Sequence, residues 1–180
     1  MPRLLIVRHA KAATAVQGAN DHSRPLAPAG VAQLPHLAAA VVAALAAPAP
    51  ASPDSARRDS ARLDPAPLDP APLDLVLCSP SARTRETVAG LVQAEPQLGA
   101  ARVKVKRALY LADVDDLLTV LRHLPDNVET ALICGHNPGL HELALTLLGP
   151  AADAQLRQGL PTAGLVVVDL DTNWASIGAQ

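Results

Sequence analysis

Three short segments of the sequence carry histidine, arginine or serine directly after a run of apolar residues. Arg8-His9-Ala10 follows LLIV, residues 79–84 (SPSART) follow LVLC, and residues 135–139 (GHNPG) follow ALIC. Each segment alone is a weak indication, since glycine, asparagine and proline form ordinary turns. A serine before proline often does no more than cap a helix, which is the simplest interpretation of Ser79. Together, however, the segments place two arginines and two histidines where packing gives them no reason to be.

This combination of side chains suits phosphoryl transfer. Guanidinium groups bind phosphate oxygens in pairs, and histidine adds further donors. A neutral imidazole attacks phosphorus when one ring nitrogen is unprotonated and the other is held by a hydrogen bond. Nearby arginines lower the pKa of a histidine such as His9 and so keep it neutral. Because phosphoryl transfer depends mainly on positioning and charge stabilisation, we expect no metal and no cofactor.

The elements around these segments predict the fold class. Continuous apolar runs, typical of strands buried on both faces, predict strands at 4–7, 75–78, 103–105, 131–134 and 165–170. Alanine-rich or amphipathic stretches predict helices at 30–47, 81–94, 113–124 and 140–148. This alternation predicts a three-layer α/β/α sandwich with a mainly parallel central sheet. In such sheets ligands bind beyond the carboxyl ends of the strands, which is where the three segments lie.

Composition and charge exclude several classes of protein. The formal net charge is −2 and there is no block of lysine and arginine, so we expect no nucleic-acid partner. The longest apolar run, 37–47, is too short to span a bilayer, and the run 4–7 is too short for a signal sequence. We therefore expect a cytoplasmic protein with no membrane partner. Cys78 and Cys134 are interpreted as buried structural thiols.

The chain of 180 residues is expected to form one domain, 1–180, interrupted by one insert. Residues 48–74 are dominated by proline, alanine, aspartate and serine, and LDPAP occurs twice in tandem. So many prolines exclude a helix or a central strand, and the composition predicts a solvated loop. The sequence gives neither a purpose for the tandem nor an oligomeric state.

The segments RHA, SPSARTRET and GHNPGL resemble, in order and spacing, the histidine phosphatase superfamily, also known as phosphoglycerate-mutase-like. They are most similar to its small SixA-like branch, which includes phosphohistidine phosphatases. Residues 24–30 (RPLAPAG) and 160–163 (LPTA) resemble that branch too, so that the resemblance covers nearly the whole chain except the insert. It implies that His9 is the phosphorylated nucleophile. It also implies phosphate-holding groups at Arg8, Arg83 and His136, and substrate contacts at Arg24, Asn137 and Thr162. For Arg24, a structural salt bridge is the alternative.

The chain departs from the family at one position. Many relatives carry a glutamate general acid in the segment that here reads LYLAD, residues 109–113, where no glutamate is present. Asp113 and Asp115 are the weak candidates to replace it, although their position favours a role at a helix N-terminus. A phosphohistidine leaving group depends less on such an acid, because its own imidazole can carry a proton. The departure therefore favours a phosphoprotein substrate.

Three functions remain open at this point. The first is a phosphatase for phosphohistidine, or another phosphorylated residue, in a protein. The second is a phosphatase for a small phosphorylated metabolite or nucleotide. The third is a non-catalytic phosphate-binding module, which the intact set of core residues argues against. The remaining histidines are expected to have no catalytic role: surface positions for His22, His36 and His123, and a packed or capping role for His141.

Overall fold

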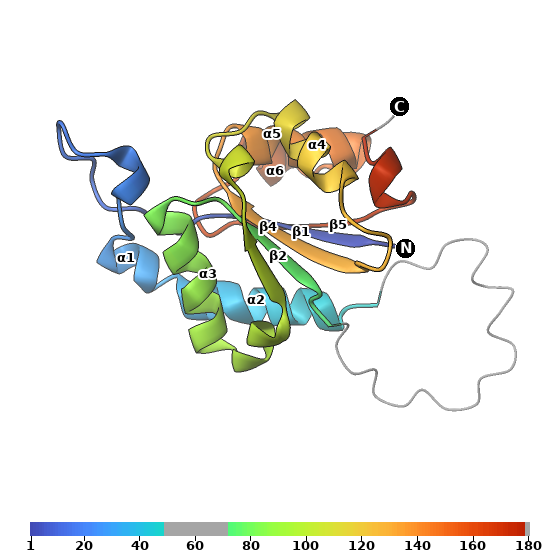
Figure 1. The fold of residues 1–180 in the computed structure, drawn as a ribbon, viewed down its shortest axis with the longest axis horizontal. Coiled ribbons are helices and arrows are strands. Elements are labelled where there is room, and N and C mark those ends of the chain that lie inside the picture. The colour runs from blue at the N-terminus through green and yellow to red at the C-terminus, as the bar shows by residue number, and fades with distance from the viewer. Residues whose placement is uncertain (49–71, 179–180) are drawn as a thin grey trace, which may run out of the picture.

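The computed structural model describes residues 1–48 and 72–178 and is built around one five-stranded sheet (Figure 1). The strand order is β3-β2-β4-β1-β5. Neighbouring strands are parallel except that β5 runs antiparallel to β1. The strands are β1 (Arg3–Arg8), β2 (Leu75–Cys78), β3 (Arg102–Val105), β4 (Thr130–Gly135) and β5 (Leu165–Asp169). The predicted α/β class with a mainly parallel sheet is confirmed.

Helices cover both faces of this sheet. One face is covered by α2 (Leu34–Ala46), which follows the short α1 (Pro28–Val31), and by α3 (Ala82–Ala94). The other is covered by α4 (Val114–Arg122), α5 (Gly139–Leu148) and α6 (Ala154–Gln158). The 3-10 turns are η1 (Asp21–Ser23), η3 (Pro96–Ala100), η4 (Arg107–Leu109), η5 (Gly149–Ala151) and η6 (Trp174–Ser176). The three predicted layers are therefore present.

Alternation along β1 divides the core between the two faces. Leu4 and Ile6 belong to the cluster beneath α4 and α5, whereas Leu5 and Val7 belong to the cluster beneath α2 and α3. All four side chains are fully buried. Burial of one such side chain stabilises the fold by roughly 1.5–3 kcal/mol. The sheet is thus anchored from both sides, which holds the ends of its strands in place.

Two predictions about the elements are wrong in part. The strand at 103–105 is β3, which lies at the edge of the sheet and is exposed at all four residues rather than buried. The helix expected over 30–47 is divided into α1 and α2 by a break at Ala32 and Gln33. Gly30 explains the position of α1, because a β-carbon at residue 30 would collide with the backbone carbonyl of Lys11. The α1 segment is therefore placed by its contact with the chain after β1.

Among the described residues, one stretch, Pro28–Ala46, has the length and apolar composition of a membrane-spanning helix. A core helix passes the same test, and here Leu37, Val41 and Leu45 of α2 are buried against the sheet. The location of the protein in the cell stays a prediction. Most of the predicted proline-rich insert, residues 49–71 with all but the last residue of the LDPAP tandem, lies outside the described residues.

Candidate active site

The three predicted segments meet because strands β1, β4 and β2 end in register. Val7 pairs with Cys134, and Cys134 pairs with Cys78 on its other side. The backbone N–H of His9 then donates to the carbonyl of Gly135 at 3.2 Å, and that of Ser79 donates to Cys134 at 3.0 Å. The residues that follow the three strands therefore emerge side by side at the carboxyl edge of the sheet.

His9 is held in one tautomer. Its Nδ1 lies 2.8 Å from the carbonyl oxygen of Ala10. A carbonyl only accepts, so Nδ1 carries the proton and Nε2 presents a lone pair. Nε2 in turn lies 3.3 Å from the Nε of Arg83, which donates to it. Burial, together with the charges of Arg83, Arg8 and Arg24, lowers the pKa of His9 to about 4. His9 is therefore neutral near pH 7, with its unprotonated nitrogen facing a guanidinium group.

Arg83 lies in the first turn of α3 and is 2% exposed. Thr87, one turn later, donates its hydroxyl to the Arg83 carbonyl at 2.7 Å and accepts the N–H of Ala10 at 3.1 Å. This pair of bonds joins the helix to the loop that follows His9. Besides its contact with His9, the guanidinium donates to the backbone carbonyl of Asp21 at 2.8 Å and to its carboxylate at 2.9 Å.

His136 follows β4 and faces His9, with 5.2 Å between the ring centroids. Its Nε2 lies 2.8 Å from the Ser79 hydroxyl, while its Nδ1 is buried and has no partner among the described residues. Burial and the charge of Arg83 lower the pKa of His136 to about 3. The interpretation of Ser79 as a helix cap is wrong, because Ser81 occupies the N-cap of α3 and Ser79 orients the histidine instead.

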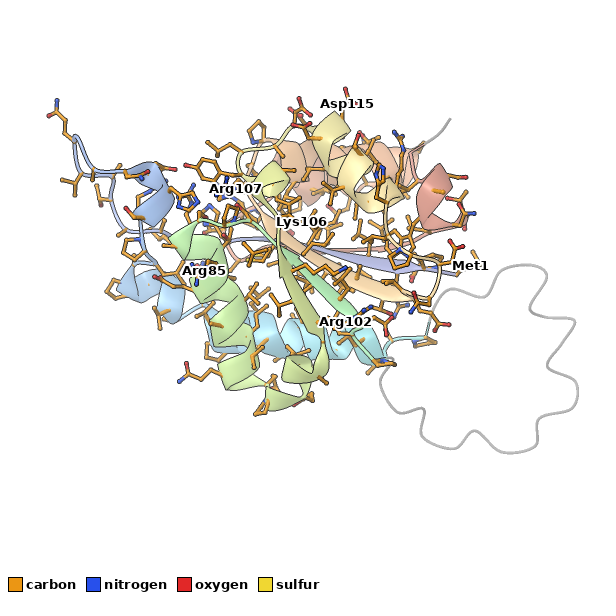
Figure 2. All side chains as sticks on the ribbon, viewed as in Figure 1. Met1, Arg85, Arg102, Lys106, Arg107 and Asp115 are labelled. Carbon is orange, nitrogen blue, oxygen red and sulfur yellow. The ribbon has the colours of Figure 1, made fainter. Side chains whose placement is uncertain are left out.

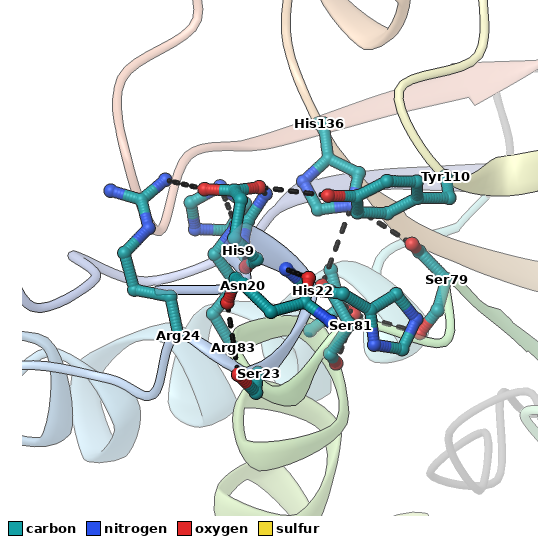
Figure 3. Close-up of polar contacts among 12 residues, drawn as sticks. His9, Asn20, His22, Ser23, Arg24, Ser79, Ser81, Arg83, Tyr110 and His136 are labelled. Carbon is teal, nitrogen blue, oxygen red and sulfur yellow. Dashed lines mark hydrogen bonds and ion pairs between the residues drawn. The ribbon is translucent and has the colours of Figure 1, made fainter. Parts of the chain in front are cut away.

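A carboxylate that the sequence analysis missed lies at the centre of this group. Asp21 accepts from Arg24 at 2.9 Å, from Arg83 at 2.9 Å and from the Tyr110 hydroxyl at 2.8 Å (Figure 3). The Tyr110 hydrogen bond and the two guanidinium groups hold the pKa of Asp21 below its ordinary value. Arg24 thus forms the salt bridge that was its alternative role, but that salt bridge lies at the site.

Tyr110 reaches the site from the segment between β3 and α4. Its ring lies edge-on to that of His136, with 5.5 Å between centroids. The segment is held there by a close approach to α5, since a β-carbon on Gly139 would collide with the carbonyl of Ala112. The available signals in the sequence were that Tyr110 is the single tyrosine of the chain and that Asp21 precedes Arg24 by three residues.

Arg8 and Asn137 share one acceptor. The Arg8 guanidinium and the Asn137 amide donate to the carbonyl of Leu160 at 2.7 and 2.9 Å. Within the described residues, Arg8 Nε and Asn137 Oδ1 are nevertheless buried without a partner, as is Arg24 Nε. Burial lowers the pKa of Arg8. Buried donors without partners are costly, so Arg8 Nε and Arg24 Nε are placed to meet an anion, whereas Asn137 Oδ1 is an acceptor and does not contribute to this.

The remaining predicted site residues lie outside this group. Thr162 is half-buried, and its side chain has no hydrogen bond with a described residue, although the next residue, Ala163, donates its N–H to the His9 carbonyl at 3.2 Å. Asp113 caps α4 by accepting the N–H of Asp116 at 2.9 Å, and Asp115 is exposed in the first turn of that helix. Neither carboxylate contacts the site, so their expected role at a helix N-terminus is confirmed.

The other histidines behave mostly as expected. His36 and His123 are exposed, and His141 donates to the Leu156 carbonyl at 2.7 Å, which is a packed role. His22 is the exception, because it is half-buried and its ring lies 5.1 Å from that of Tyr110. The expectation of a simple surface position for His22 is therefore wrong.

Taken together, the arrangement can hold an anion with several oxygens and offer it a nucleophilic nitrogen. The positive charge comes from three arginines, Arg8, Arg24 and Arg83, which belong to β1, to the loop before α1 and to α3, and whose charges all act on His9. Among the described residues, no group of three or more histidine, cysteine, aspartate or glutamate side chains has the geometry to hold a metal ion.

Comparison with known proteins finds relatives that match almost the full length of this chain. No family model matches the chain. An uncharacterised protein of Mycobacterium tuberculosis (strain H37Rv) is 30% identical over 176 residues, which cover 95% of this chain and 91% of the relative. A protein of Agrobacterium tumefaciens classed as the phosphohistidine phosphatase SixA superposes with a TM-score of 0.71 at 27% identity, over 94% of this chain and 92% of its own. One of the same class from Nakamurella multipartitia gives 0.67 at 27% identity, over 98% and 89%.

Proposed function

Because the chain belongs to the histidine phosphatase (phosphoglycerate-mutase-like) superfamily, with SixA-like proteins among its structural neighbours, we propose that it is a phosphatase that acts on phosphohistidine in a protein. The observation that carries this proposal is the fixed tautomer of His9. Its protonated nitrogen is bonded to Ala10, and its lone pair is directed at the Arg83 guanidinium. A phosphoryl group bound to that guanidinium lies directly in front of the nucleophilic nitrogen.

Binding exchanges one anion for another. The phosphoryl oxygens replace the Asp21 carboxylate on Arg83 and Arg24, and also take the unpartnered nitrogens Arg8 Nε and His136 Nδ1. A phosphoryl group has three non-bridging oxygens and can satisfy donors from several directions, as a single carboxylate cannot. The low pKa of His136 gives a neutral ring, so that its Nδ1–H donates a hydrogen bond while Nε2 accepts from Ser79.

The chemistry then takes two steps. In the first, the His9 Nε2 lone pair forms a bond to phosphorus while the bond from phosphorus to the leaving imidazole nitrogen breaks. The electron pair of the broken bond goes to that imidazole, which already carries its own proton. In the second, a water oxygen attacks phosphorus, the bond to His9 breaks, and inorganic phosphate leaves with a neutral histidine restored.

Asp21 is poorly suited to donate a proton to the leaving group in the free protein. Its pKa lies below the ordinary aspartate value, because Tyr110 and two guanidinium groups stabilise the ionised form. Asp113 and Asp115 do not contact the site. A leaving group that carries its own proton fits this site better than an alkoxide, which supports phosphohistidine as the substrate.

The test is acid-quenched trapping with a phosphohistidine peptide labelled on phosphorus. Wild type is expected to carry acid-labile, base-stable label, His9→Ala to carry none, and His36→Ala, a change at an exposed histidine, to match wild type. Parallel turnover of an aryl phosphate, sugar phosphates and nucleotides reports on substrate class. Faster turnover of a metabolite than of the peptide would assign a small-molecule phosphatase. Binding of phosphate with no label and no turnover of any donor would assign a non-catalytic module.

A further inference from the structure

A groove adjoins the active site and is not used by the chemistry described above. It encloses about 500 Å³ and is lined by His22, Pro80, Arg85, Val105, Arg107 and Tyr110. Tyr110 links the two places, because its hydroxyl bonds Asp21 in the site while its ring packs against His22 at 5.1 Å. The groove and the site therefore share the Tyr110 side chain, which also lies against His136.

The groove carries positive charge without local compensation. Arg85 and Arg107 are exposed, and neither forms an ion pair with another described residue (Figure 2). None of the six lining residues is acidic. The neighbouring carboxylate Glu86 is engaged elsewhere, since it accepts the backbone N–H of Leu26 at 2.7 Å. Asp21, at the boundary with the site, is already bonded by Arg24, Arg83 and Tyr110.

Part of the groove's lining is apolar. Val105 ends the edge strand β3 and is 53% exposed, and Pro80 begins the turn from β2 to α3. An exposed valine that lines the same groove as two unpaired arginines suits a ligand that has both apolar and anionic groups. A peptide with carboxylate side chains meets this description, because its backbone and methylene groups can cover the valine while its carboxylates reach the guanidinium groups.

We propose that this groove binds an acidic segment that adjoins the phosphorylated residue of the protein substrate, with its carboxylates on Arg85 and Arg107. The proposal rests on the proposed phosphatase function for its physiological meaning, but the groove itself is a separate binding site. It makes the enzyme selective for phosphoproteins with acidic surroundings, while a small aryl phosphate uses the catalytic residues alone.

The experiment compares two phosphohistidine peptides that differ only in three residues beside the phosphohistidine, glutamate in one and glutamine in the other. Wild type is expected to show a kcat/KM about tenfold higher for the glutamate peptide at low salt, and to lose most of this preference at 0.5 M salt. The double variant Arg85→Glu/Arg107→Glu is expected to reverse the preference and to turn over the aryl phosphate within twofold of wild type.

The matched control is Arg102→Glu/Lys104→Glu, which makes the same change in net charge at exposed positions on β3 that do not line the groove. This control is expected to keep the preference. Equal turnover of the two peptides by wild type, or an equal loss by both double variants, would overturn the proposal.

Direct binding separates failure of the groove from failure of the proposed function. Fluorescence anisotropy of the unphosphorylated glutamate peptide requires no catalysis, and binding that is lost in Arg85→Glu/Arg107→Glu supports the groove even if no phosphorylated donor is turned over. Absence of binding together with normal aryl phosphate turnover rejects the groove and leaves the phosphatase intact.

Discussion

Strand β1 has an arginine at each end, and the two are held in different ways. Arg3, at the amino end, is 7% exposed and is fully engaged by the fold. It donates to the Asp169 carboxylate at 2.6 Å and to the carbonyls of Ala44 and Ala47 at 2.8 and 2.7 Å. These bonds join β5 and the end of α2 to the start of β1.

The side chain of Arg8, at the carboxyl end, has a single hydrogen bond to a described residue, the carbonyl of Leu160, and its buried Nε has no partner among the described residues. Its neighbours, the histidines, are neutral, and the carboxylate at that end, Asp21, is already shared by two arginines and a tyrosine. At the amino end of β1 the charge of Arg3 is therefore neutralised by Asp169 within the fold. At the carboxyl end the charge of Arg8 has no such partner among the described residues and is available to a ligand. The difference separates a structural arginine from a functional one on the same strand.

The largest expected effect follows from Arg8→Ala. Loss of a group that stabilises the transferring phosphoryl oxygens is expected to lower kcat/KM about 100- to 1,000-fold on every phosphorylated substrate. Stability should change little, because Asn137 still donates to the Leu160 carbonyl. Steady-state kinetics and urea unfolding measure the two quantities. A loss of activity that merely follows a loss of folded protein would remove the distinction between the two arginines.

Arg3→Ala is expected to have the opposite profile. It breaks a largely buried ion pair and frees two backbone carbonyls, which lowers the free energy of unfolding by about 3 kcal/mol. The folded fraction should keep its kcat/KM within twofold, because Arg3 lies at the far end of the strand. Asp169→Asn, which keeps the shape of the partner, should cost less. An Arg3→Ala protein that unfolds like wild type would contradict the structural role.

The histidines at the carboxyl end also make the stability of the protein depend on pH. The pKa values of His9 and His136, about 4 and 3, lie below the ordinary value of 6.5. The unfolded chain therefore binds more protons than the folded one below pH 6.5. The free energy of unfolding should be highest above pH 6.5 and fall by about 3 kcal/mol for each of the two histidines as the pH is lowered to 4.

Urea unfolding at pH 7.5, 6, 5 and 4 measures this loss, and His9→Asn/His136→Asn should remove most of it. Asp21 acts in a different range: its lowered pKa contributes stability that is lost only as the pH falls below about 4. An unchanged pH dependence in the double histidine variant would show that other groups are responsible.

The smallest expected effect comes from Asp21→Asn. The asparagine can still accept from Tyr110, but it no longer competes as an anion for Arg24 and Arg83. Inhibition by inorganic phosphate or tungstate should therefore strengthen about tenfold, or ~1.4 kcal/mol. Asp115→Asn, which makes the same charge change at an exposed position, is the control. Unchanged oxyanion binding with a large fall in kcat would instead assign proton transfer to Asp21.

Much of the architecture could be predicted from the sequence because the central strands are continuous apolar runs. The runs before His9, Ser79 and Gly135 gave β1, β2 and β4 to within two residues, and the rule for parallel sheets then brought the three segments together. The edge strand β3 was misjudged as buried, although its alternation of valine with Arg102 and Lys104 is typical of a strand exposed at the margin of a sheet.

The contacts of Asp21 could not be predicted in the same way. Its hydrogen bond to Tyr110 spans 89 residues and joins two irregular segments, neither of which has a periodic pattern to fix its path. The role of Ser79 was hidden for a similar reason, since a serine at the start of a helix usually serves as its cap, and only the position of His136 reveals the alternative.

The near absence of aromatic residues gives the protein two separate spectroscopic reporters. The chain has no phenylalanine, one tryptophan and one tyrosine. Trp174 is 1% exposed in the core beneath α4 and α5 and donates to the Val128 carbonyl at 2.7 Å, before the amino end of β4, whereas the site lies beyond the carboxyl end of that strand, so its fluorescence follows global unfolding. Tyr110 donates its hydroxyl to Asp21, so its ultraviolet absorption follows the release of that carboxylate when an oxyanion binds. Ligand occupancy and folding can thus be read independently from the unlabelled protein.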